Sequence, residues 1–191
     1  MICLYDAEKH VYTIDDIVVP SVTAILKAKS GFSNVPMRIL KPASGRGKIV
    51  HMATHYYDQN DLEESSISEE TAGYLEGWKK FKKDFKVDML SIEVPLYSVT
   101  YGFAGTPDRI ASVIGRLAII DIKTGKTEPK TIGEQMAAYE IAYKDTYGDC
   151  MMLRYGVQLT PGGTYNIWPC KSTSDHGSFL QELKYYKKEK I

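Results

Sequence analysis

The sequence has few cysteines, no net charge and no long apolar run, and each of these absences narrows what the protein can be. Its three cysteines, Cys3, Cys150 and Cys170, are an odd number without C-x-x-C spacing. We therefore expect reduced thiols, and neither a disulfide framework nor a four-thiolate metal cluster. No apolar run approaches the ~20 residues of a membrane span, and the N-terminus lacks the pattern of a secretory signal. A cytoplasmic location without a membrane partner is expected.

The charges balance at 24 basic and 24 acidic residues, which by itself argues against a nucleic-acid partner. Their distribution argues the other way, because residues 17–57 contain no aspartate or glutamate. The basic residues of this stretch are Lys27, Lys29, Arg38, Lys41, Arg46 and Lys48. A solvated surface is the simpler interpretation of such a charge run, and a surface that binds phosphates is the alternative.

The size and composition predict one domain over residues 1–191, built from several helices. Ser21 is the expected N-cap of the first helix, and Thr131 with Glu134 forms the T-x-x-E pattern of a capping box at the start of a later one. The expected helices are 22–29, 45–57, 69–85, a helix from Thr131 toward Gly148, and a basic C-terminal helix.

Strands are expected where alternating or continuous apolar residues are bounded by turn residues. They are two short strands within 10–19, then 91–100, 103–113 and 117–123, and a hairpin of 151–158 and 164–168. A turn at residues 114–116 connects the second and third central strands. In such a hairpin, residues whose numbers sum to about 230 lie opposite one another, and Asp108 with Asp121 satisfies this condition.

Two acids and a lysine are thereby predicted to converge. Side chains alternate along a strand, so Asp121 and Lys123 lie on one face, and Ile120 and Ile122 on the other. Carboxylates this close repel each other unless they share a proton or bind a cation. Their hard oxygens favour Mg²⁺ or Mn²⁺, which can activate water for attack on a phosphodiester. An ordinary ion pair of Asp108 with Lys123 is the alternative.

The wider pattern resembles a known family. The segments 105–109 and 119–125 precede a helix with the pattern Q-x-x-x-Y at Gln135 and Tyr139, and R-G-x-x-x-H lies upstream at residues 46–51. This order resembles the RecB-like branch of the PD-(D/E)XK nucleases, which includes phage and mitochondrial exonucleases. The resemblance extends from Arg46 to about Tyr143.

The resemblance implies an α/β fold with a restriction-endonuclease-like core, in which a central mixed β-sheet is flanked by helices. It also implies roles for particular side chains. The implied catalytic residues are Asp108, Asp121, Lys123, Gln135 and Tyr139. The implied metal residues, for Mg²⁺ or Mn²⁺, are His51, Asp108, Asp121, Ile122 and Glu93. The expected DNA contacts are Lys41, Arg46, Lys48, Arg109 and Lys126, the first three forming one wall of a groove.

Several of these residues have simpler interpretations. A single histidine such as His51 is more often a core or surface residue than a ligand, and Glu93 can be an exposed strand residue. Tyr139 can belong to the core. His51 and His55 have the spacing of a zinc-binding helix, but Met52 stands where a zinc peptidase has glutamate, so we reject that class.

The expected function is an exonuclease that hydrolyses phosphodiester bonds at DNA ends in recombination, repair or phage replication. A structure- or sequence-specific endonuclease and a catalytically silent DNA-binding module are the alternatives. Relatives with an iron–sulfur cluster need four cysteines, so no cluster is expected here. The sequence contains no P-loop, so a recombination or helicase partner is expected on a separate chain. The oligomeric state stays open.

Overall fold

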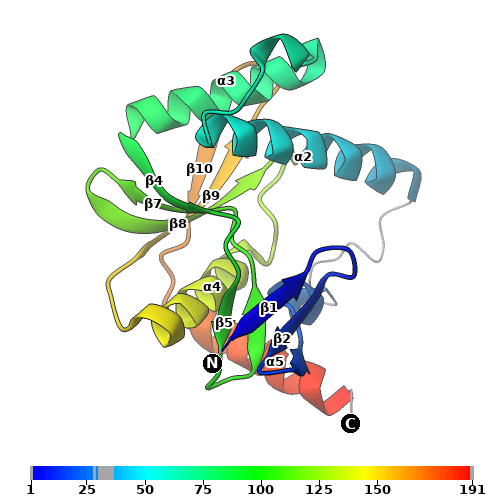
Figure 1. Cartoon of the computed structure of the whole chain (residues 1–191), viewed down its shortest axis with the longest axis vertical. Helices are drawn as coiled ribbons and strands as arrows, with labels where there is room; N and C mark the ends of the chain where they lie inside the picture. The colour runs from blue at the N-terminus through cyan, green and yellow to red at the C-terminus, as the bar shows by residue number, and fades with distance from the viewer. Residues whose placement is uncertain (1, 28, 30–36, 190–191) are drawn as a thin grey trace.

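The computed structural model describes residues 2–27, 29 and 37–189, with the backbone alone for residues 37–43. Its centre is a five-stranded mixed sheet in the order β10-β9-β8-β7-β4 (Figure 1). The neighbours β8 and β9 are parallel, and all other neighbouring pairs are antiparallel. The strands are β4 (Val87–Ile92), β7 (Arg109–Val113), β8 (Arg116–Lys123), β9 (Leu153–Leu159) and β10 (Tyr165–Pro169).

Helices cover both faces of this sheet, as the α/β prediction requires (Figure 1). On one side lie α2 (Met37–Asp58) and α3 (Glu69–Asp84). On the other lie α4 (Ile132–Tyr147) and α5 (Ser174–Glu189). A central mixed sheet flanked by helices is therefore confirmed.

The alternation of side chains along β8 explains why two cores form. Ile120 and Ile122 are buried with Trp78 of α3, whereas Ile119 is buried with Met136 of α4. A run of consecutive apolar residues, as at positions 117–120 of β8, is typical of a sheet that is covered on both faces. Burial of these side chains, each worth about 1.5–3 kcal/mol, anchors the strand that carries Asp121 and Lys123.

Smaller elements surround this core. The helix α1 (Val22–Leu26) begins where predicted, with Ala24 N donating to Ser21 Oγ at 3.1 Å, but it ends three residues before Lys29. The remaining elements are β1 (Cys3–Asp6), β2 (Val11–Ile14), β3 (Ile17–Val19), β5 (Leu96–Ser98), β6 (Phe103–Gly105) and the 3₁₀ turn η2 (Glu64–Ser66). The two strands predicted within 10–19 are present, and β1 was not predicted.

Three predicted details are wrong. The strand expected over 103–113 is divided into β6 and β7, because Pro107 has no N–H to donate to a strand partner. The strand expected over 91–100 is likewise divided, into the end of β4 and β5. The capping box does not form. Thr131 makes no side-chain cap bond, and Glu134 instead pairs with Lys29 at 2.9 Å.

The tight turn between β7 and β8 fixes the register that matters for the site. Ile114 and Gly115 both have positive φ, 49° and 73°, which a two-residue hairpin turn of type I′ needs. Arg109 consequently lies opposite Ile120. The same register, continued by one residue, brings Asp108 opposite Asp121 as predicted. None of the described helices is long and apolar enough to cross a membrane.

Candidate active site

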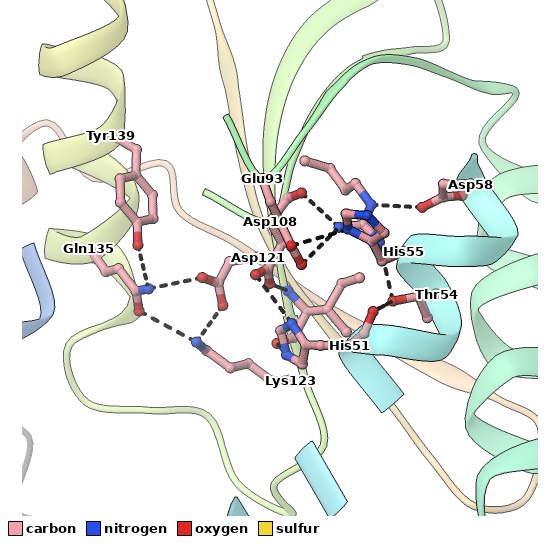
Figure 2. Close-up of polar contacts among 12 residues, drawn as sticks. His51, Thr54, His55, Asp58, Glu93, Asp108, Asp121, Lys123, Gln135 and Tyr139 are labelled. Atoms are coloured by element: carbon pink, nitrogen blue, oxygen red, sulfur yellow. Dashed lines mark hydrogen bonds and ion pairs between the residues drawn. The ribbon is translucent and has the colours of Figure 1, made fainter. Parts of the chain in front are cut away.

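Asp108 lies in the short segment between β6 and β7, at the end of the hairpin that faces α2 (Figure 2). Its Oδ2 accepts a hydrogen bond of 2.6 Å from Ile122 N on β8. Its Oδ1 lies 3.2 Å from Nδ1 of His51, and His51 Nε2 lies 3.0 Å from the carbonyl oxygen of Ile122. The Asp108 carboxylate is therefore fixed between a strand and a helix that are distant in sequence.

Asp121 faces the opposite way, toward α4 (Figure 2). Its Oδ2 forms an ion pair with Lys123, and its Oδ1 accepts a hydrogen bond of 2.9 Å from Gln135 Nε2. Gln135 Nε2 also lies 3.1 Å from the Tyr139 hydroxyl, one helical turn further on. The predicted catalytic residues Asp121, Lys123, Gln135 and Tyr139 thus form one connected group.

The pKa values of the two carboxyl groups, Asp108 and Asp121, are shifted in opposite directions. Burial by itself would raise the pKa of Asp108, but the neighbouring His51 lowers it below the usual aspartate value. Burial and the negative charge of Asp108 raise the pKa of Asp121 despite its contact with Lys123. In turn, Asp108 raises the pKa of His51 to about 9. A pair of buried acids that differ in this way is typical of functional sites.

The residues present fit a divalent cation. His51, Glu93 and Asp108 each offer one ligand atom, and these atoms lie within 4.8 Å of one another. Asp121 is not part of this trio, because its Oδ2 is paired with Lys123 and its Oδ1 accepts from Gln135. Ile122 has only its carbonyl oxygen to offer. Carboxylate and carbonyl oxygens with one imidazole suit Mg²⁺ or Mn²⁺, and the nitrogen shifts the preference toward Mn²⁺.

Glu93, one member of this trio, has an unusual backbone conformation. Its φ is +50°, a region that residues other than glycine adopt at a cost of about 1–3 kcal/mol. A hydrogen bond of 3.0 Å from Glu93 N to the carbonyl oxygen of Asp108 holds this conformation. The strained residue is therefore tied directly to the metal-ligand candidate beside it.

The structure adds His55 to the residues expected from the sequence. His55 Nδ1 lies 3.1 Å from Glu93 Oε2, an ion-pair distance without hydrogen-bond geometry. It is one helical turn after His51, so both imidazoles project from the same side of α2 (Figure 2). The spacing H-x-x-x-H was the available signal, but it suggested zinc. The partner, Glu93, is 38 residues further along the chain.

Arg109 corrects an expectation. It was expected to contact phosphate, but its side chain is completely buried. Its guanidinium donates to Asp58 at 2.7 Å, to the carbonyl oxygen of Asp108 at 2.7 Å and to Thr54 Oγ1 at 3.2 Å. Thr54 and Asp58 belong to α2, so Arg109 connects this helix to β7 beneath the site.

The other expected DNA contacts differ in placement. Lys48 and Lys126 are exposed, whereas Arg46 is partly buried and its Nε has no hydrogen-bond partner in the described part of the chain. The side chain of Lys41 lies outside the described residues. The middle of α2 approaches the loop after β8, since a Cβ on Gly47 would lie 3.7 Å from Thr124 Oγ1. These basic residues therefore belong to two segments that meet beside Lys123.

Comparison with known families agrees with this geometry. The model of the PD-(D/E)XK nuclease superfamily matches residues 42–166, which is more than half of the 191-residue chain. The matched region contains all of the predicted catalytic and metal residues, and of the predicted DNA contacts it leaves out Lys41. The chain therefore belongs to the PD-(D/E)XK nuclease superfamily.

One solved structure shares the fold at low sequence identity, and a second aligns more weakly. A candidate exonuclease from Eubacterium rectale aligns with a TM-score of 0.58 and 12% identity, over 90% of this chain and 79% of that one. An alkaline exonuclease from Laribacter hongkongensis aligns with a TM-score of 0.39 and 14% identity, over 89% and 91% of the two chains. The comparison with curated proteins found no match.

Proposed function

We propose that the protein is a Mg²⁺- or Mn²⁺-dependent deoxyribonuclease that hydrolyses phosphodiester bonds at DNA ends. One observation carries the proposal. Asp108 belongs to a trio of ligand atoms that fits a divalent cation, and the buried ion pair of Asp121 with Lys123 lies on the neighbouring strand β8. Three acids, Glu93, Asp108 and Asp121, thus gather around His51 and Lys123, and a bound cation would offset the excess of negative charge.

In this proposal His51, Glu93 and Asp108 hold the cation together with Asp121 and the carbonyl oxygen of Ile122. When bound, the cation supplies Lewis-acid activation of the phosphodiester and of water. His51 would ligate as the neutral imidazole, so the proton that Asp108 favours on it would have to leave. Glu93 contributes a ligand that its strained backbone and His55 have already oriented, which reduces the entropy lost on binding.

Lys123 acts on the substrate side of the site. Its ammonium group lies against Asp121 and is aligned by Gln135 Oε1 at 3.5 Å, so its position is fixed before DNA binds. A preorganised positive charge stabilises the negative charge that develops on the phosphoryl oxygens during hydrolysis. Gln135 and Tyr139 hold Asp121 in place from α4.

DNA would approach over the basic residues of α2 and of the loop after β8. Lys48 and Lys126 are exposed there, so both can contact phosphates. Arg46 remains part of this proposal through its partly buried side chain. Lys41 remains part of this proposal. Cleavage at ends, and a role in recombination, repair or phage replication, are supported by the R-G-x-x-x-H and Q-x-x-x-Y motifs and by the shared fold with the Eubacterium rectale protein.

The test compares end-labelled linear DNA, single-stranded and duplex, with a closed circle in Mg²⁺, Mn²⁺ or EDTA. We expect metal-dependent loss of the linear DNA alone. Cleavage of the circle would replace the exonuclease by an endonuclease. Binding of DNA without cleavage under every condition would leave a silent binding module.

A further inference from the structure

An apolar row lies on the exposed side of α2. Ile49, Met52 and Tyr56 follow one another at spacings of three and four residues, and they are 51%, 56% and 42% exposed. This spacing places them on one side of the helix, next to the side that carries His51 and His55. Three large apolar side chains are thus held in water directly beside the candidate cation site.

The contact between the row and the site is direct. The rings of His55 and Tyr56 meet edge to face, with centroids 5.6 Å apart and planes at 77°. His55 in turn lies 3.1 Å from Glu93 Oε2. The Tyr56 ring is therefore separated from a proposed metal ligand by a single side chain, and its position is restrained by an aromatic contact.

The dimensions of the row suit a nucleic-acid strand. From Ile49 to Tyr56 the helix rises about 10 Å, which is the length of roughly three stacked bases. Lys48 is exposed at one end of the row and supplies a positive charge for the phosphates of such a strand. A second protein surface fits less well, because a stable interface buries about 800 Å² per partner, far more than three side chains provide.

We propose that Ile49, Met52 and Tyr56 form a stacking platform for the unpaired nucleobases next to the phosphodiester that is cut. This inference rests on the proposed function and adds a substrate preference to it. Aromatic and apolar side chains stack on the faces of all four bases. The platform would therefore favour single-stranded or frayed DNA without reading its sequence, since paired bases do not expose their faces.

The experiment measures binding in EDTA, so that cleavage plays no part. The probes are a labelled single strand of about 12 nucleotides and an abasic strand with the same number of phosphates. We expect Tyr56→Ala to weaken binding of the normal strand about tenfold and to leave binding of the abasic strand unchanged. Tyr56→Phe should retain wild-type affinity. The matched control is Tyr147→Ala, which removes a 60% exposed tyrosine at the C-terminal end of α4.

Several results would overturn the platform. One is that Tyr56→Ala loses the same affinity for the normal and the abasic strand, and another is that it loses affinity for neither. A third is that the wild-type protein does not prefer the strand with bases. If Tyr56→Ala and Met52→Ser change the oligomeric state and leave DNA binding intact, the row is a self-association surface. Cleavage of DNA by the wild-type protein is measured separately, so the platform can fail while the nuclease proposal stands.

Discussion

The Arg109 guanidinium donates to the Asp58 carboxylate at 2.7 Å, and both side chains are completely buried. Asp58 also accepts hydrogen bonds from the Trp78 indole at 3.0 Å and from Lys82 at 2.6 Å. This network joins α2, α3 and β7 beneath the site. It keeps His51 on α2 within reach of Asp108 on the sheet side.

The first prediction follows from this burial. Arg109→Gln should lower the free energy of unfolding by about 3–5 kcal/mol, because it leaves the buried Asp58 carboxylate with Lys82 as its one remaining cationic partner among the described residues. Urea denaturation followed by circular dichroism measures this loss. Lys126→Gln, at an exposed position, should stay within about 0.5 kcal/mol of wild type. An Arg109→Gln variant of normal stability, but with a weaker salt dependence of DNA binding, would restore Arg109 as a phosphate contact.

The second prediction concerns the cation. Removal of a residue that orients a metal ligand typically lowers metal affinity about 10–100-fold. His55→Ala should therefore weaken Mn²⁺ binding by about tenfold, and Glu93→Gln should weaken it further because it replaces the ligand itself. Isothermal titration calorimetry of the DNA-free protein gives both values. His55→Gln, which places an amide N–H near Glu93, should recover part of the affinity. Unchanged Mn²⁺ affinity in His55→Ala would show that His55 does not orient Glu93.

The third prediction concerns the support of Asp121. Gln135→Ala removes a hydrogen bond to a charged group, worth about 1.5–3 kcal/mol, so the cleavage rate should fall roughly 10–100-fold. Tyr139→Phe removes only the hydroxyl that contacts Gln135, and its effect should be smaller. Single-turnover kinetics at saturating metal measure both rates. If Tyr139→Phe lowers the thermal midpoint and leaves the rate unchanged, Tyr139 is a core residue, as its burial also allows.

The fourth prediction concerns acid stability far from the site. Burial alone would raise the pKa of Glu140, but hydrogen bonds from His176 at 2.9 Å and Lys144 at 3.0 Å lower it to about 2. A depressed carboxyl pKa stabilises the fold above the ordinary value of 4.5, and this stabilisation is lost as the pH falls from 4.5 to about 2. The unfolding free energy of wild type should therefore decrease over this range.

The Glu140→Gln variant tests the assignment. It should be less stable than wild type at pH 7 by about 1.5–3 kcal/mol, and its stability should depend less on pH below 4.5. Glu8→Gln, at an exposed position, is the matched control and should follow the wild-type curve. Parallel curves for wild type and Glu140→Gln would show that other carboxylates dominate the acid transition.

The sequence was informative wherever local rules determine geometry. The turn at Gly115 and the alternation along β8 were enough to predict the register of Asp108 and Asp121 and the shared face of Asp121 and Lys123. Both depend only on neighbouring residues and on the period of a strand. The catalytic and DNA-binding roles of the residues, and the extent of one domain over 1–191, stay predictions.

Contacts between distant segments were not accessible in the same way. Whether Arg109 faces solvent or Asp58 depends on where α2 packs, which no local pattern encodes. Likewise, the contact of His55 with Glu93 depends on a positive φ at Glu93. The T-x-x-E pattern at Thr131 predicted a cap, but Glu134 binds Lys29 on another segment instead. In each case a tertiary contact determined the structure.

The most direct test of the account is cleavage of end-labelled linear DNA by wild type and by Asp121→Asn, with Mn²⁺ titrated from zero. Asp121→Asn keeps the shape of the side chain and removes its charge. The account predicts metal-dependent loss of linear DNA by wild type and a rate at least a thousandfold lower, about 4 kcal/mol of transition-state stabilisation, for Asp121→Asn. Equal cleavage by both proteins, or cleavage by wild type in EDTA, would contradict it.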